Sequence, residues 1–168
     1  VRRDAEQALQ ESGKALEERL RFESLLSDVS ARVVQAPSDR LDGEIEHALR
    51  VVVNFFQVDR CGLIRASRYL TAWPATHVAY ADDQVTRVPV GFDFPRTKNP
   101  WAYERLFEKG QVLAFSSIAN LPTEAQVDRQ TWLERGTRSS LLIPISTGEA
   151  VDYVITINAL KRERDWPG

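Results

Sequence analysis

The sequence predicts an α+β domain in which a central antiparallel sheet carries helices packed on one face, preceded by one long N-terminal helix. Residues 1–35 contain no proline and are rich in strong helix formers. Two later regions, residues 58–80 and 138–160, show the short apolar pattern of strands. The only short connections between the expected strands are of the hairpin type, which favours antiparallel pairing over a βαβ arrangement.

The N-terminal helix has apolar positions that change face part of the way along. Its first stripe follows steps of four, three and four, the spacing of a short coiled-coil seam: Leu9, Gly13, Leu16 and Leu20. A step of only two residues, which rotates the stripe by roughly 200°, leads to a second set: Phe22, Leu26, Val29 and Val33. We therefore expect a coiled-coil helix over residues 1–21 with a dimer seam of Leu9, Leu16 and Leu20, and a separate domain over residues 22–168. A merely amphipathic surface helix is the alternative.

The remaining elements follow from apolar spacing and from helix start and stop signals. Asn99 and Gly110 delimit one short helix, and Thr123 with Gln126 forms a capping-box pattern ahead of Gly136. The expected elements are a helix at 41–56, a strand at 58–65, one or two strands at 69–80, an irregular segment at 81–98, helices at 99–110 and 123–136 around a strand at 111–115, and a hairpin of strands at 138–146 and 151–160.

Composition excludes several classes of function. The net charge of −2 provides no basic surface for nucleic acid or for an acidic membrane. One cysteine, Cys61, excludes an internal disulfide, and with only His47 and His77 beside it a protein-built metal site is not expected. No apolar run approaches the length of a membrane span. We therefore expect a cytoplasmic domain that contacts neither nucleic acid nor membrane.

Four segments resemble the GAF family: a helix that runs into a strand over residues 49–64, the hairpin over 140–160, and residues 21–32 and 162–167. The resemblance covers residues 21–168 and implies a GAF-like fold of the PAS and profilin type. It also implies a sensory domain from a larger bacterial signalling protein, a sensor histidine kinase or an AAA+ transcription activator. Because the chain begins at Val1 within a helical pattern and holds no methionine, we interpret it as a fragment whose final helix lies beyond Gly168.

Several activities of GAF relatives need residues that this sequence lacks. The GAF-like methionine sulfoxide reductases depend on several cysteines, and bilin-binding relatives use a cysteine in the pocket region, where residues 66–168 hold none. The cyclic-nucleotide signature is absent, since Lys98-Asn99 has the reversed order. Cys61 lies in an apolar strand, which predicts a buried, inert thiol. His77 is the one candidate haem ligand, although a hydrogen-bonded strand histidine is the commoner case. Neither a cofactor nor an enzymatic activity is therefore expected.

Large rings crowd into residues 81–136, which we call the cover because this segment must cover one face of the sheet. Rigid rings on a backbone interrupted by proline and glycine leave room for a cavity, although a solid core is the alternative. The expected ligand pocket consists of Trp73, Phe92, Phe94, Trp101, Phe107, Phe115 and Trp132, with Arg138 as a counter-charge. Arg96 and Arg129 are further candidate counter-charges. Two floors stay open, because a slip of one residue exchanges the faces of a strand: Leu141 with Ile143, or Leu142 with Ile155.

The sequence thus predicts a non-enzymatic sensory domain that binds an unknown small molecule and relays a conformational signal through a homodimer. Two alternatives remain at this level. One is a structural dimerisation and relay module with a filled core, and the other is a haem or cofactor sensor that uses His77.

The first testable prediction concerns the dimer seam. Placing a charge in the seam with Leu16→Asp should weaken self-association at least tenfold while leaving the domain folded, because an aspartate cannot be buried at a coiled-coil contact without a partner. Analytical ultracentrifugation measures the association, and circular dichroism checks the fold. Equal self-association of a chain that begins near Arg21 would contradict the seam.

Overall fold

A computed structural model describes residues 1–89, 91–146 and 148–166 of the chain, with the side chains of residues 26, 29, 30 and 33 left undescribed. The residues group into two compact units, Val1–Ala48 and Leu49–Gly168. The division falls inside one helix, α2 (Leu41–Phe56). The boundary that the sequence places between residues 21 and 22 lies within an unbroken helix and stays a prediction.

The first unit contains the long helix α1 (Arg2–Gln35), whose extent the sequence predicts correctly, and the first half of α2. Arg32 joins the two helices: its guanidinium forms an ion pair with Glu44 at 3.0 Å and a hydrogen bond with His47 Nε2 at 3.0 Å. The three expected seam residues are exposed by 76%, 59% and 57%, in the order Leu9, Leu16 and Leu20. The second apolar stripe of α1 cannot be assigned a face, because the side chains of Leu26, Val29 and Val33 lie outside the description.

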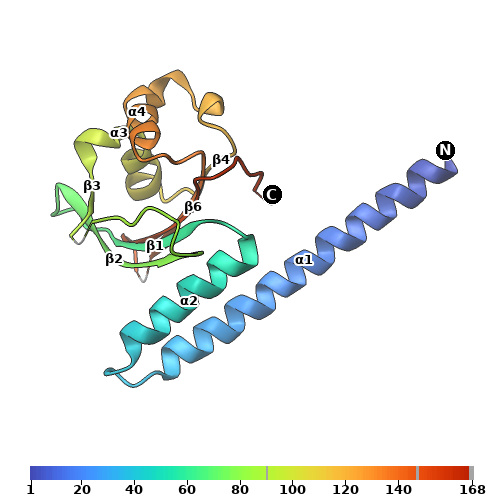
Figure 1. Ribbon diagram of the computed structural model, residues 1–168, viewed down its shortest axis with the longest axis horizontal. Coiled ribbons are helices and arrows are strands. Elements are labelled where there is room, and N and C mark those ends of the chain that lie inside the picture. Colours follow the sequence, from blue (N-terminus) through green and yellow to red (C-terminus); the bar gives the residue numbers. More distant parts are fainter. Residues whose placement is uncertain (90, 147, 167–168) are drawn as a thin grey trace. The chain divides into compact units, whose positions relative to one another are not determined.

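The second unit is built on a six-stranded antiparallel sheet in the order β3-β2-β1-β6-β5-β4, which confirms the predicted fold class (Figure 1). The strands are β1 (Arg60–Arg65), β2 (Ala72–Tyr80), β3 (Asp93–Pro95), β4 (Leu113–Phe115), β5 (Ser139–Ser146) and β6 (Val151–Ala159). The final hairpin β5–β6 lies where the sequence places it, except that residue 147 in its turn lies outside the description.

The cover differs from the expectation in three places. β3 was not predicted, because three residues are too few to show an alternating pattern, yet it pairs with β2 through Trp73 and Phe94. The expected helix at 99–110 is a short α3 (Pro100–Tyr103) followed by a π-helical turn, Glu104–Glu108. Residues 123–125 form a 3₁₀ turn before α4 (Gln126–Glu134), so the expected capping box does not form.

The register of the sheet divides its side chains between two faces. Cys61 lies opposite both Ile157 and Ala79, so these three side chains share one face. The second half of α2, with the buried residues Val53 and Phe56, lies on this side of the sheet. The cover, with α3 and α4, lies on the other side (Figure 1).

Two clusters of rings hold the cover together. Trp73 stacks on Tyr103 with ring centroids 4.0 Å apart, and Phe107 lies against both rings. In the second cluster the ring centroids of Phe115 and Trp132 are 4.7 Å apart. Such contacts between aromatic rings stabilise by more than their buried area alone, so these rings pack the cover against the sheet.

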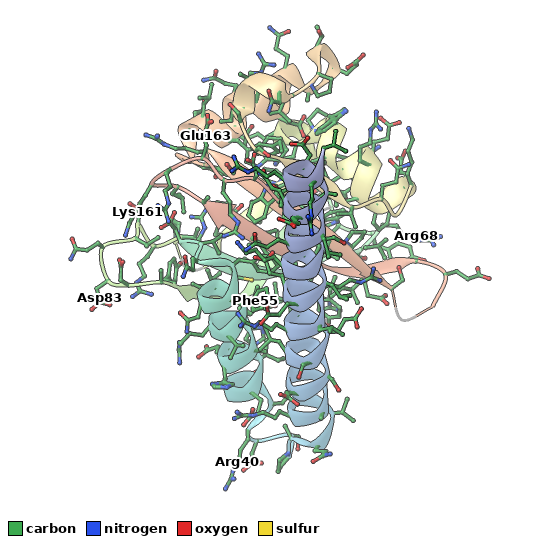
Figure 2. All side chains as sticks on the ribbon, turned by 90° about the vertical axis from the view of Figure 1, so that its right-hand side faces the viewer. Arg40, Phe55, Arg68, Asp83, Lys161 and Glu163 are labelled. Carbon is green, nitrogen blue, oxygen red and sulfur yellow. The ribbon has the colours of Figure 1, made fainter. Side chains whose placement is uncertain are left out.

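The segment that follows β6 is held against the second unit by hydrogen bonds; Figure 2 labels Lys161 in this segment. The backbone N–H of Lys161 donates to the Asp59 carboxylate at 3.0 Å. The indole N–H of Trp166 donates to the carbonyl of Phe115 at 3.1 Å. Residues 167–168, where the sequence suggests the start of a further helix, lie outside the description. In the part of the chain that is described, every helix is too short or too polar to cross a membrane.

The second prediction concerns the thiol of Cys61, which is fully buried. Burial raises the pKa of Cys61 from 9.0 to about 12. Between these values the unfolded chain loses the thiol proton and the folded chain keeps it, so the free energy of unfolding should fall as the pH rises through this window. The loss should reach about 1.4 kcal/mol at pH 10.

Cys61→Ala provides the matched control, because its free energy of unfolding lacks this dependence on pH. Urea denaturation of both proteins from pH 7 to pH 10 isolates the contribution of the thiol as their difference. Rapid labelling of the native protein by a thiol reagent at pH 8 would contradict the burial on which this prediction depends.

The third prediction concerns Asp128, a fully buried carboxylate that joins α4 to α3. Its two oxygens accept the backbone N–H groups of Trp101 at 3.1 Å and Ala102 at 2.8 Å, so Asp128 caps α3 from another helix. Asn99, the expected N-cap, instead donates its side-chain amide to the carbonyl of Pro95. Asp128→Ala should lower the free energy of unfolding by about 3 kcal/mol in chemical denaturation. The exposed Glu124→Ala should change it by less than about 0.5 kcal/mol, and an equal effect of both would refute the cap.

Candidate functional site

The second unit contains a cavity between the sheet and the cover. Its volume is about 50 Å³, enough for only a few water molecules. The floor comes from the two central strands, and the roof comes from β3, the segment before it and the end of α4. The neighbouring strands β2 and β5 add Ala75, Val78 and Leu142. The site therefore lies between the middle of the sheet and its least regular layer.

Alternation along the strands builds the floor. Arg60, Gly62 and Ile64 of β1 point to the same face because they are two residues apart. The register places Asn158 opposite Arg60, and Thr156 opposite Gly62. All five residues line the cavity.

Gly62 leaves space in this floor, because it has no side chain. A Cβ atom built on it would lie 3.1 Å from the hydroxyl oxygen of Thr156, closer than side chains normally approach. A larger residue would therefore push Thr156 out of place and reduce the cavity.

The roof combines rings with a cation. Phe92, Phe94 and Trp132 line it together with Arg135, the residue that follows α4. The guanidinium of Arg135 lies 4.6 Å from the ring centre of Phe92 and 5.5 Å from that of Phe94. Each ring face attracts the positive charge. Gly136 then reverses the chain with φ of 71°, a conformation that favours glycine, so the position of Arg135 is fixed by the end of the helix.

The floor also contains a buried cation. Arg60 is only 9% exposed. Burial lowers its pKa, and the pKa of Arg135 is lowered first by burial and then by the positive charge of Arg60. The cavity thus contains two guanidinium groups close enough to repel each other.

Polar side chains complete the lining. Thr137, Thr156 and Asn158 are all buried there. The side-chain oxygen of Asn158 accepts a hydrogen bond from the Ser140 hydroxyl at 2.8 Å. This bond orients the amide so that its N–H₂ group is the free end.

The structure divides the sequence-predicted pocket residues into two groups. Three of them line the cavity: Phe92, Phe94 and Trp132. Four pack elsewhere in the cover or its core and do not line it: Trp73, Trp101, Phe107 and Phe115.

The predicted counter-charges also lie away from the cavity. Arg138 is exposed, and Arg96 forms an ion pair with Glu108 on the surface. Arg129 donates to a backbone carbonyl, that of Leu121. The cations of the cavity are therefore Arg60 and Arg135, which the sequence analysis did not select. The available signals were a charged residue in phase with Gly62 on an apolar strand, and an arginine directly before a helix-ending glycine.

The register of β5 and β6 also shows which residues of the two pairs expected as the floor of the pocket face the cavity. Leu142 lines the cavity and pairs with Thr156, whereas Leu141 pairs with Ile157 on the opposite face. Leu142 and Ile155 cannot form a floor together, because residues 142 and 156 are opposite each other and residue 155 points to the other face.

His77 lies outside this site. It pairs with Leu63, whose side chain points away from the face of Arg60 and Gly62. Its ring nitrogen Nδ1 is 3.0 Å from the Thr76 hydroxyl. Over the described ranges, no three His, Cys, Asp or Glu side chains gather as a metal site would require.

Comparison with solved structures identifies the fold. The phycoerythrobilin-bound GAF domain of a cyanobacterial phytochrome superposes with a TM-score of 0.69 at 17% identity, over 86% of this chain and 84% of that one. The GAF domain of an Acinetobacter phosphoenolpyruvate-protein phosphotransferase gives 0.59 at 11% identity, over 86% and 80%. A Staphylococcus aureus NreA protein, mutated in its nitrate binding site, gives 0.55 at 10% identity, over 77% and 94%.

Sequence comparison adds nothing to this, since no family model and no curated protein sequence matches the chain. The structural similarity extends over most of the chain and over most of each GAF domain compared. It agrees with the resemblance in the sequence and with the order of strands. The chain has the fold of the GAF domains.

Proposed function

We propose that this chain is a non-enzymatic sensory domain that binds a small molecule in the cavity between the sheet and the cover. The observation that carries the proposal is the cavity itself, which combines an apolar roof with polar groups of the sheet. Ligand sites in proteins have this character: mostly apolar walls with a few fixed polar groups. The GAF domains of similar structure include one that binds a bilin, which supports a sensory role.

A catalytic role has little support from the side chains present. The thiol of Cys61 is the strongest candidate nucleophile by type, but it is buried on the face away from the cavity and its pKa is raised by burial. A protonated, inaccessible thiol cannot attack a substrate.

The ligand of this cavity is smaller than the pigment of the bilin-binding neighbours. A volume of about 50 Å³ accepts a handful of non-hydrogen atoms, whereas pockets for drug-sized ligands measure roughly 300–1,000 Å³. Residues 66–168 contain no cysteine to which a bilin could be attached. The haem alternative has no support from His77, which lies outside the cavity. The alternative of a filled core is disfavoured by the cavity, although only a ligand can exclude it.

Signal transmission would use the helices. The exposed leucine stripe of α1 supports a homodimer seam through Leu9, Leu16 and Leu20. Ligand binding would shift the balance between two states of the domain, and α1 would carry this shift to the partner chain. Such a domain suits a cytoplasmic signalling protein, such as a histidine kinase or an AAA+ transcription activator.

The fourth prediction tests the cavity as a ligand site. A panel of small neutral and charged metabolites should contain a class that raises the melting temperature, since a ligand selective for the native state must stabilise it. Ala75 lines the cavity from β2, so Ala75→Leu should fill part of the space and abolish the shift. Differential scanning fluorimetry measures both.

Ala114→Leu is the matched control, because Ala114 is exposed on β4. It introduces the same side chain outside the cavity and should leave the response unchanged. If no compound shifts the melting temperature of the wild-type chain, or if Ala75→Leu responds as the wild type does, the structural relay becomes the better function.

A further inference from the structure

We infer that the ligand of this cavity is a small oxyanion, bound between Arg60 and Arg135. The inference rests on the proposed function, because it names the chemical class of the molecule that occupies the same site. The class includes inorganic phosphate, nitrate and short carboxylates, which share two or more oxygens that carry the negative charge around one central atom.

The first argument is the balance of charge. Across the described ranges, neither guanidinium has a carboxylate within ion-pair distance, and no side chain or backbone group accepts a hydrogen bond from either. The attraction that acts on Arg60 comes first from Tyr80 and then from Asp59, whose carboxylate accepts the backbone N–H of Lys161 and is not in an ion pair with Arg60. The exposed Asp93 and Glu134 likewise attract Arg135 without an ion pair. Arg60 is therefore a buried cation without an ion-pair partner, which is costly, and a negative charge in the cavity would stabilise it.

The second argument is the donors of the two guanidinium groups, for which the described residues provide no hydrogen-bond acceptor. The guanidinium of Arg135 contacts the rings of Phe92 and Phe94, which accept no strong hydrogen bond from its N–H groups. Arg60 is 9% exposed and lines the same cavity. Both arginines line one cavity, and the N–H groups of a guanidinium form a fork that matches the oxygens of an anion.

The third argument is the rest of the lining. Asn158 contributes an amide N–H₂ group, because its oxygen is already bound by Ser140. The hydroxyls of Thr137 and Thr156 can donate as well. Among the described residues that line the cavity, none carries a carboxylate. A site rich in donors and without negative charge favours an anion over a neutral or cationic ligand.

The fourth argument is size. The cavity of about 50 Å³ matches an ion of four or five non-hydrogen atoms, on the scale of a few water molecules. The rings of Phe92 and Trp132 line the side of the cavity that the cover forms. Apolar walls lower the local dielectric constant, which strengthens the attraction between an ion and the guanidinium groups.

The experiment titrates the full chain with sodium phosphate, nitrate and acetate at constant ionic strength, with chloride as the balancing ion. Isothermal titration calorimetry measures the affinity, and differential scanning fluorimetry measures the melting temperature. At least one oxyanion should bind and raise the melting temperature by several degrees over chloride. The three anions separate the sources: a tetrahedral dianion, a planar inorganic anion and a carboxylate.

Arg60→Met and Arg135→Met should each weaken the preferred oxyanion at least about tenfold, because each removes a charged donor fork. Arg138→Met removes an exposed arginine near the same elements and should bind as the wild type does. Without oxyanion, the melting temperature of Arg60→Met should not fall, since the substitution removes a buried charge and the repulsion of Arg135. If either Arg60→Met or Arg135→Met fails to fold, the affinity of the other variant for the oxyanion still tests the inference.

The outcomes separate this inference from the proposed function. If neutral compounds stabilise the chain through the cavity and no oxyanion binds, the oxyanion is refuted and the sensory site stands. If neither kind of compound acts, both are refuted. Equal binding by the wild type and both arginine variants would indicate a general salt effect and refute the site. A fall in the melting temperature of Arg60→Met in chloride would assign Arg60 to packing instead of anion capture.

Discussion

The antiparallel pairing of β1 with β6 is the constraint on which the rest of the domain depends. It places Arg60, Gly62 and Ile64 on the face beneath the cover, and Cys61 with its partner Ile157 on the opposite face. A slip of one residue would expose the thiol to the cavity and turn the guanidinium toward the opposite face. Because both faces are buried, the apolar side chains themselves enforce the register. The same alternation that builds the core therefore places a cation at the site.

The regular part of this fold could be predicted from the sequence, since it depends on local signals. The bounds of α1 and α2 follow from apolar spacing and from the absence of proline, and the β5–β6 hairpin follows from alternation around a turn. The cover could be predicted only in outline. β3 exists because Asp93–Pro95 pairs with β2, and α3 is capped by Asp128 from far along the chain. No pattern within a short window encodes such partners.

The candidate site shows the same limit more sharply. Aromatic crowding predicted a ligand pocket beneath the cover, and three of the selected rings, Phe92, Phe94 and Trp132, line the cavity there. The sequence could not distinguish Trp73 from these residues, because a ring that lines a cavity and a ring that packs in the core have the same sequence pattern. Only the structure shows that Trp73 stacks on Tyr103. Arg60 and Arg135 are 75 residues apart in the sequence. Their meeting is a property of the sheet and the end of α4 together.

Trp132 lies in the roof of the cavity and touches Phe115, while the other three tryptophans lie outside the lining. Indole emission depends on the polarity and on the charges around the ring. The domain thus contains an optical reporter at the position where occupancy changes the local field, with the guanidinium of Arg135 lining the same space. Substituting the three remote indoles by phenylalanine would leave one fluorophore whose colour and lifetime follow the content of the cavity in real time, without an attached dye.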